Sequence, residues 1–185
     1  LPVMDKWLLS KLNTVVKAVD ENLANYKIPE TARALQEFVD DMSNWYVRRC
    51  RDRFWAKGME QDKINAYMTL YTALVTISKA AAPMVPFMTE SIYRNLVCSL
   101  DKAAPESIHL CDFPEFKEEW IDKDLEAKMD VLLQIVVLGR ACRNEANIKN
   151  RQPIGMLYVK DEKNEELSEF YQEIIADELN VKKVI

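Results

Sequence analysis

Helical periodicity is the feature that most constrains how this chain can fold. Apolar residues recur every three or four positions through most of the sequence, which places them on one face of a helix. Proline and glycine number only 7 and 3, so few residues interrupt this pattern. The segments that carry it are 5–26, 29–58, 62–82, 87–100 and 122–146. The sequence therefore predicts a mainly α protein, a bundle of four to five helices.

The pattern changes near the C-terminal end. Residues 156–159 and 181–185 have the short apolar runs typical of strands, and 165–179 has the spacing of an amphipathic helix. We therefore predict two domains: a helical bundle over 1–153 and a small β-α-β unit over 154–185. The chain begins without methionine and stops inside an apolar run, which predicts a piece of a longer polypeptide with a truncated small unit.

Local signals predict where helices begin and end. Asp5 and Asp62 are expected as N-caps, and Asn147 as a left-handed residue after a helix. Residues 101–121 lose helical spacing and contain two prolines, so we expect a loop, held along the bundle by its apolar residues. The core face expected for the 62–82 helix consists of Ile64, Tyr67, Met68, Tyr71, Leu74, Val75, Ile77 and Ser78.

Composition excludes several classes of function. A net charge of −5 gives no whole-surface attraction to nucleic acid, and no apolar run reaches the ~20 residues of a membrane helix. Four scattered cysteines without a CxxC pair, and one histidine, His109, predict no zinc site and a reducing, cytoplasmic location. A Gly-rich phosphate loop and a nucleophilic triad are also missing, so no catalytic residue, metal or cofactor is predicted in this chain.

Arginine is distributed unevenly, because seven of the nine arginines fall within 48–53 and 140–151. Two helical turns hold about seven residues, so positions seven apart share a face. Arg49 and Arg53 continue the apolar stripe of the 29–58 helix, and Arg140 and Arg143 continue that of the 122–146 helix. In both helices the core face therefore becomes cationic at its C-terminal end.

Two interpretations of these arginines stay open. Their stems can cover apolar surface while the charges pair with carboxylates or with a helix C-terminus. Alternatively, the guanidinium groups bind a phosphate or another domain, since either offers bidentate partners.

Several segments together resemble the isoleucyl-tRNA synthetases in the region after their catalytic core. The likeness covers nearly all 185 residues, in order and with fitting gaps. The segments that carry it are 4–12, 44–55, 82–87, 107–114 and 139–153. In the family the stretch that corresponds to residues 149–154 is usually Lys-Val-Arg-Gln-Pro-Leu, whereas Asn150 and Ile154 stand here at its second and last positions.

The resemblance implies the helical anticodon-binding domain of a class I synthetase, packed against the anticodon stem-loop of the tRNA for isoleucine. The full enzyme uses ATP with Mg²⁺ in a catalytic domain of the same polypeptide, and its nucleotide motifs are missing here. The fragment would then bind without catalysing. The alternatives are the same domain of valyl-tRNA synthetase and a helical protein-interaction module without an RNA role.

The arginines and lysines divide by their helical position. Residues on the inner stripes, Arg49, Arg53, Arg140 and Arg143, are expected to be structural or to brace the bundle against another domain. The candidate RNA-binding residues are Arg48, Arg51, Lys57, Lys149 and Arg151.

Overall fold

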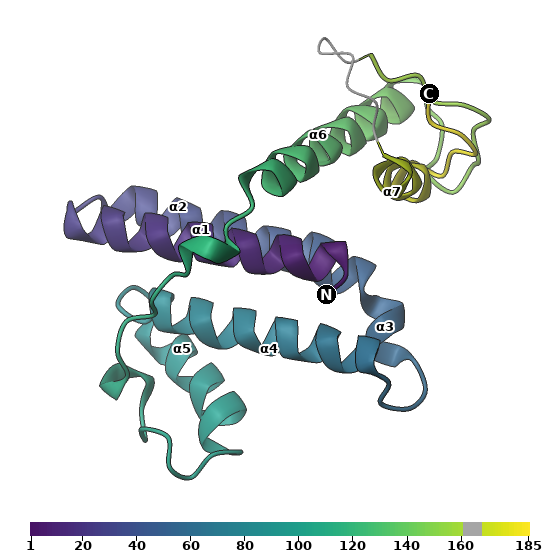
Figure 1. The fold of residues 1–185 in the computed structure, drawn as a ribbon. Helices are drawn as coiled ribbons and strands as arrows, with labels where there is room; N and C mark the ends of the chain where they lie inside the picture. The colour runs from purple at the N-terminus through teal and green to yellow at the C-terminus, as the bar shows by residue number, and fades with distance from the viewer. Residues whose placement is uncertain (161–167) are drawn as a thin grey trace. The chain divides into compact units, whose positions relative to one another are not determined.

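The chain forms two compact units, Leu1–Lys123 and Asp124–Ile185, which we describe separately (Figure 1). The computed structural model describes residues 1–160 and 168–185. In these two ranges no helix combines the length and hydropathy needed to cross a bilayer. The expected domain division at 153/154 does not coincide with the boundary between these units, and it stays a prediction.

The first unit is built around its N-terminal helix. Helix α1 packs against both α2 and α4, and α5 packs against α4 (Figure 1). Trp7, Leu8 and Val16 of α1 are almost completely buried, so this helix supplies much of the core. The helices are α1 (Val3–Ala24), α2 (Ile28–Asp41), α3 (Arg51–Trp55), α4 (Gln61–Ala81) and α5 (Pro86–Tyr93). Shorter elements are the π-helices η1 (Met42–Val47) and η2 (Arg94–Cys98) and the 3-10 turns η3 (Ile108–Leu110) and η4 (Glu118–Trp120).

The expectation of one continuous helix over 29–58 is wrong. Helix α2 passes into the π-helix η1, and residues 48–50, which end in the non-helical Cys50, lie between η1 and α3. A π turn holds one residue more than an α turn, so it changes which positions face inward. Met42, Tyr46 and Cys50 are buried at four-residue spacing, whereas Val47 is exposed.

The face that α4 turns inward agrees with the expected one only in part: Ile77 and Ser78 are buried as expected, whereas other expected residues are not. Its buried residues include Ala66, Thr69 and Ala73, while the large side chains of Tyr67 and Met68 are 45% and 55% exposed. Small residues allow two helix backbones to approach closely, and α1 is among the helices that pack against α4.

Both aspartates expected as N-caps have another role. Pro2 precedes α1, and Asp5 lies inside its first turn with its side chain buried. Glu60 precedes α4, and Asp62 lies in the first turn of that helix. The prediction for Asn147 is confirmed, because this residue follows α6 with a φ of 54°.

The loop over 101–121 lies along the first unit, as expected. Its Ile108 is buried with Tyr93 in a small apolar cluster. Two buried polar side chains of α1 fasten the end of the loop. Asn13 accepts a hydrogen bond from the backbone N–H of Lys117 at 2.8 Å, and Ser10 accepts one from that of Asp122 at 2.8 Å.

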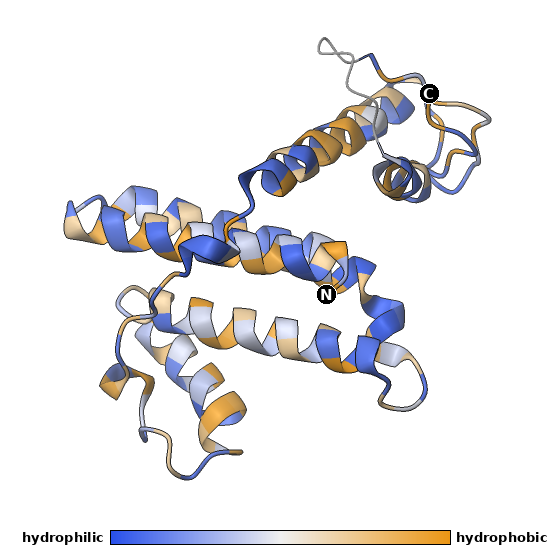
Figure 2. Ribbon diagram, in the orientation of Figure 1, coloured by the Kyte–Doolittle hydropathy of each residue, from blue (hydrophilic) through white to orange (hydrophobic). Residues whose placement is uncertain are grey.

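The second unit consists mainly of α6 (Lys123–Glu145), which begins at the boundary, and α7 (Glu169–Leu179). Figure 2 shows that hydrophobic residues dominate the middle of α6. Gly139 of α6 lies against α7, since a Cβ built on this glycine would be 2.3 Å from a methyl carbon of Leu179.

The expected β-α-β unit is wrong, although its helix is present as α7. Among the described residues, 154–157 and 181–184 meet only through two isolated parallel bridges, Ile154–Val181 and Leu157–Val184. These bridges are three residues apart, whereas a regular ladder repeats every two residues, so no continuous strand forms. The helix was expected from residue 165, and 165–167 lie outside the described residues.

Candidate nucleic-acid interface

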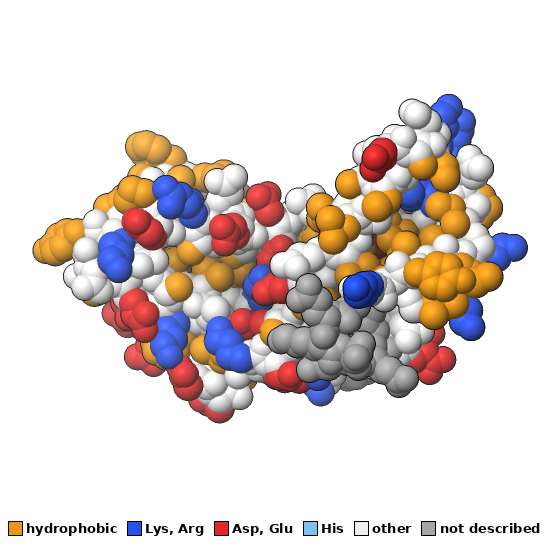
Figure 3. Space-filling model, turned by 90° about the horizontal axis from the view of Figure 1, so that it is seen from above, with side chains coloured by type: hydrophobic (Ala, Val, Ile, Leu, Met, Phe, Trp, Pro, Cys, Tyr) orange, Lys and Arg blue, Asp and Glu red, His pale blue; other side chains and the backbone are white. Residues whose placement is uncertain are grey.

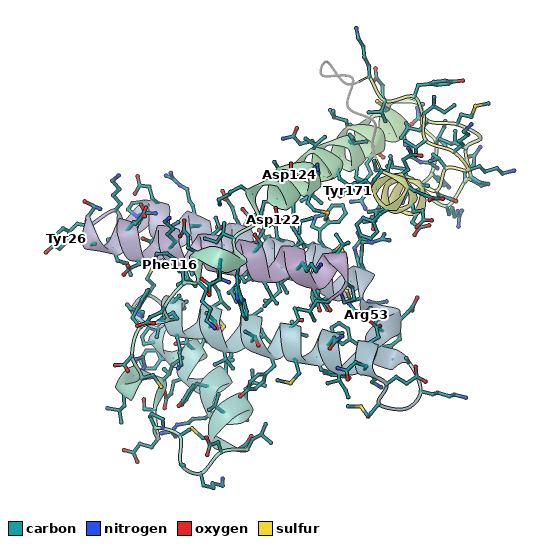
Figure 4. All side chains as sticks on the ribbon, viewed as in Figure 1. Tyr26, Arg53, Phe116, Asp122, Asp124 and Tyr171 are labelled. Carbon is teal, nitrogen blue, oxygen red and sulfur yellow. The ribbon has the colours of Figure 1, made fainter. Side chains whose placement is uncertain are left out.

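Arg53 is bound on all sides by groups of the first unit. Its Nη1 and Nη2 donate to the two carboxylate oxygens of Asp5 at 2.7 and 2.9 Å. Its Nε and Nη2 donate to the carboxylate of Asp62 at 2.8 and 2.9 Å. Two carboxylates from α1 and α4 therefore neutralise this guanidinium, which belongs to the short helix α3 (Figure 4).

The carboxylate of Asp5 is shared with a second donor, because the hydroxyl of Tyr46 donates to it at 2.8 Å. Hydrogen bonding to Asp5 is the main cause that raises the pKa of Arg53 above its ordinary value. Burial, followed by the hydrogen bond to Asp5, raises the pKa of Tyr46. Near neutral pH the network therefore contains a charged guanidinium and an un-ionised phenol. It ties the first turn of α1 to η1, α3 and α4.

The arginines beside Arg53 lie on the surface and stack on aromatic rings. Arg51 lies over the ring of Trp55 at 5.1 Å, and that tryptophan is 73% exposed. Arg48 lies over Trp45 at 5.5 Å and donates from Nε to a backbone carbonyl within its own helix at 2.8 Å. Stacking orients the planar guanidinium so that the N–H groups on its edge can meet an anion such as phosphate.

The remaining basic residues of this end differ in exposure. Lys57 is exposed, as expected for a candidate contact residue. Arg49 is half-buried and interacts within the chain.

In the second unit, two arginines of α6 face α7. Arg140 pairs with the buried carboxylate of Glu178 at 2.6 Å. Arg143 is 5% exposed and donates to the backbone carbonyls of Leu179 at 3.0 Å and Lys149 at 2.6 Å. The side chains of Lys149 and Arg151 are exposed.

A family profile described as "Anticodon-binding domain of tRNA ligase" matches residues 5–160. The chain belongs to this family. It is 57% identical over 182 residues to the isoleucine–tRNA ligase of Clostridium novyi and 53% identical over 183 residues to that of Clostridium tetani. It is also 41% identical over 187 residues to that of Dehalococcoides mccartyi.

These alignments cover 98 to 100% of this chain but only 17 to 18% of the relatives. The anticodon-binding domain described here therefore spans about a sixth of the length of the relatives that it matches. The resemblance seen in the sequence is confirmed at the level of the family.

The candidate RNA-binding residues of this anticodon-binding domain form two groups, one on each unit. Arg48, Arg51 and Lys57 belong to the first unit, and Lys149 and Arg151 to the second. All five side chains are exposed. Their contact with RNA, and the bracing role expected for the inner-stripe arginines, stay predictions.

The residues that hold the arginines of the first unit were missed in the sequence. Asp5, Tyr46 and Asp62 form the network around Arg53. Trp45 and Trp55 lie under Arg48 and Arg51. Asp5 had a usable signal, because it stands on the helix face of Leu8 and Leu12, where a charge requires a buried partner. For Trp55 the sequence offered one signal, its position within an arginine-rich segment.

Charges of both signs lie on the face of the anticodon-binding domain that is drawn in Figure 3. Figure 3 shows Lys and Arg side chains interspersed with Asp and Glu side chains, without one continuous cationic field. In the part of the chain that the structure describes, no three His, Cys, Asp or Glu residues are grouped to hold a metal ion. On the face in Figure 3, a contact with RNA would rely on local basic groups.

Proposed function

We propose that this chain is the part of an isoleucine–tRNA ligase that binds the anticodon stem-loop of the tRNA for isoleucine. Its membership of the family supports binding to tRNA. The names of the relatives support isoleucine rather than valine, since the compared proteins are isoleucine–tRNA ligases.

One observation carries the assignment of residues. Within the same short segment, Arg53 is neutralised by two carboxylates, whereas Arg48 and Arg51 are exposed and stacked on tryptophans. A basic surface interleaved with aromatic rings is typical of proteins that bind single-stranded RNA loops. Arg48, Arg51 and the nearby Lys57 would contact the phosphates of such a loop.

The rest of the enzyme lies outside this chain. A catalytic domain in the same polypeptide would use ATP with Mg²⁺ to join isoleucine to the tRNA, and no residue here is assigned to that step. The proposed partners are accordingly the tRNA and that catalytic domain, and the proposed location is the cytoplasm. A protein-interaction module without RNA binding is the outcome that the experiment below would favour if RNA fails to bind.

The test is a titration of labelled isoleucine tRNA with the chain, by fluorescence anisotropy, at several salt concentrations. Binding should be measurable at low salt and should weaken steeply as salt is added, because counterions return to the RNA when phosphate contacts break. A valine tRNA measured in parallel shows whether the chain binds the isoleucine tRNA with higher affinity than the valine tRNA. Absence of binding at low salt, or binding that salt does not change, would contradict the proposal.

A further inference from the structure

Arg143 is a buried cation held by main-chain carbonyl groups. Besides Leu179 and Lys149, its donors reach the carbonyl oxygens of Asn150, at 3.3 Å, and of Gln152. Three of the four acceptors thus belong to the loop 149–152, which connects α6 to the rest of the second unit. The position of this side chain therefore determines the path of the loop.

The end of α7 explains why a cation is stable at this place. The carbonyl of Leu179 belongs to the last turn of α7, where the helix dipole concentrates negative charge. Gly139, one helical turn before Arg143, allows α7 to lie close to α6. The nearby pair of Arg140 with Glu178 fixes the same helix end.

The inward carbonyls of the loop leave its amides facing outward. In a trans peptide the C=O and N–H bonds point in opposite directions. Because the oxygens of Lys149 and Asn150 point to Arg143, the N–H groups of Asn150 and Arg151 point away from it. Two further hydrogen bonds hold this geometry. The side-chain Nδ2 of Asn180 donates to the carbonyl oxygen of Asn150 at 3.1 Å, and the backbone N–H of Gln152 donates to that of Lys149 at 2.9 Å.

We propose that the loop 149–152 is a phosphate-binding loop for RNA and that Arg143 is its positioning residue. The loop presents two backbone N–H groups, of Asn150 and Arg151, together with the exposed cationic side chains of Lys149 and Arg151. Successive outward N–H groups form a concave anion site, and two flanking cations add charge-assisted hydrogen bonds. The inference rests on the proposed function, since it names a contact of the same RNA.

The direct test follows the backbone amides of the ¹⁵N-labelled chain by NMR during titration with an isoleucine tRNA transcript. The amide signals of Asn150 and Arg151 should shift with occupancy, whereas those of the exposed Lys182 and Lys183 should not. Inorganic phosphate, added alone, should shift the same two signals at much higher concentration. If tRNA binds while these signals stay still, the loop is not a phosphate site. If tRNA does not bind, the proposed function and this inference both fall.

Variants test whether Arg143 positions the loop for RNA or only stabilises the folded second unit. Lys149→Ala and Arg151→Ala should each lower the slope of log affinity against log salt by about one, while Lys182→Ala, a matched exposed lysine, should leave it unchanged. Arg143→Lys retains the charge but lacks the planar fork that spans several carbonyls. It should fold, bind tRNA several-fold more weakly, and lower the slope by one to two.

If Arg143 only stabilises the fold, the Arg143→Lys variant should melt at a lower temperature than wild type, while the slope of log affinity against log salt should not change. That result would overturn the positioning role. If Arg143→Lys does not fold, the two surface variants and the wild-type amide shifts still decide the proposal. Unchanged slopes in both Lys149→Ala and Arg151→Ala would refute it.

Discussion

Replacing Arg53 by alanine should destabilise the first unit more than any exposed arginine substitution. The change removes both hydrogen bonds from Arg53 to the carboxylate of Asp5, whose side chain is 0% exposed. The hydroxyl of Tyr46 still donates to this carboxylate. Removing one partner of a buried ion pair costs about 3–5 kcal/mol. Arg53 itself is 20% exposed, and Asp62 at 54% adds little, so we expect about 3 kcal/mol.

Thermal and urea denaturation at pH 7, followed by circular dichroism, measure this loss. For a unit of this size, about 3 kcal/mol corresponds to a fall in melting temperature of roughly 10 °C. Asp62→Asn is the matched control and should cost less than about 1 kcal/mol. The double variant Asp5→Leu/Arg53→Met removes both charges and should recover most of the stability. The reasoning is refuted if Arg53→Ala lies within about 0.5 kcal/mol of wild type.

Three further predictions concern other parts of the chain. Gly139→Ala should destabilise the second unit by about 1–3 kcal/mol in urea denaturation, because its methyl group would overlap α7, whereas Gly155→Ala, with open space around it, should have little effect. Burial raises the pKa of the Cys50 thiol, so a thiol reagent at pH 8 should label the exposed Cys142 first; equal rates would contradict this. A hydrogen bond from a backbone N–H lowers the pKa of Glu90. Its carboxylate therefore stabilises the fold fully above the unfolded pKa of about 4.3. The difference in melting temperature between wild type and Glu90→Gln should shrink as the pH falls below that value and should vanish below the lowered pKa of the folded state.

The long helices could be predicted because their signal is local. The apolar spacing around Trp7 and Leu8 is that of a helix in any context, and α1 forms there. The inward face of α4 depends instead on what approaches it. Apolar residues occupy more than one side of that helix, and the close packing of α1 selects Ala66 and Ala73 over the larger Tyr67.

The π-helix and the missing strands have a similar cause. The π turn in η1 places Tyr46 beside Asp5, a residue forty-one positions away in the sequence, and no local pattern reports such a contact. The apolar runs near Leu157 and Val184 have the propensity of strands, but only isolated bridges join them.

The candidate site was predictable only in part. Helical position correctly separated the exposed Arg48 and Arg51 from the more buried Arg53 and Arg143. The partners of Arg143 could not be predicted, because they are backbone carbonyls, which occur at every position of a sequence. Asp5, a partner of Arg53, could have been inferred from its place on an apolar helix face.

The measurement that most directly tests the account compares the salt dependence of tRNA binding for two variants of the first unit. Arg48→Ala/Arg51→Ala removes the stacked, exposed arginines, and Arg33→Ala removes an exposed arginine of α2 outside this cluster. The double variant should keep the melting temperature of wild type, bind isoleucine tRNA more weakly, and show a slope of log affinity against log salt lower by about two. Arg33→Ala should match wild type in all three. Equal slopes for wild type, the double variant and Arg33→Ala would contradict the assignment of this surface to RNA.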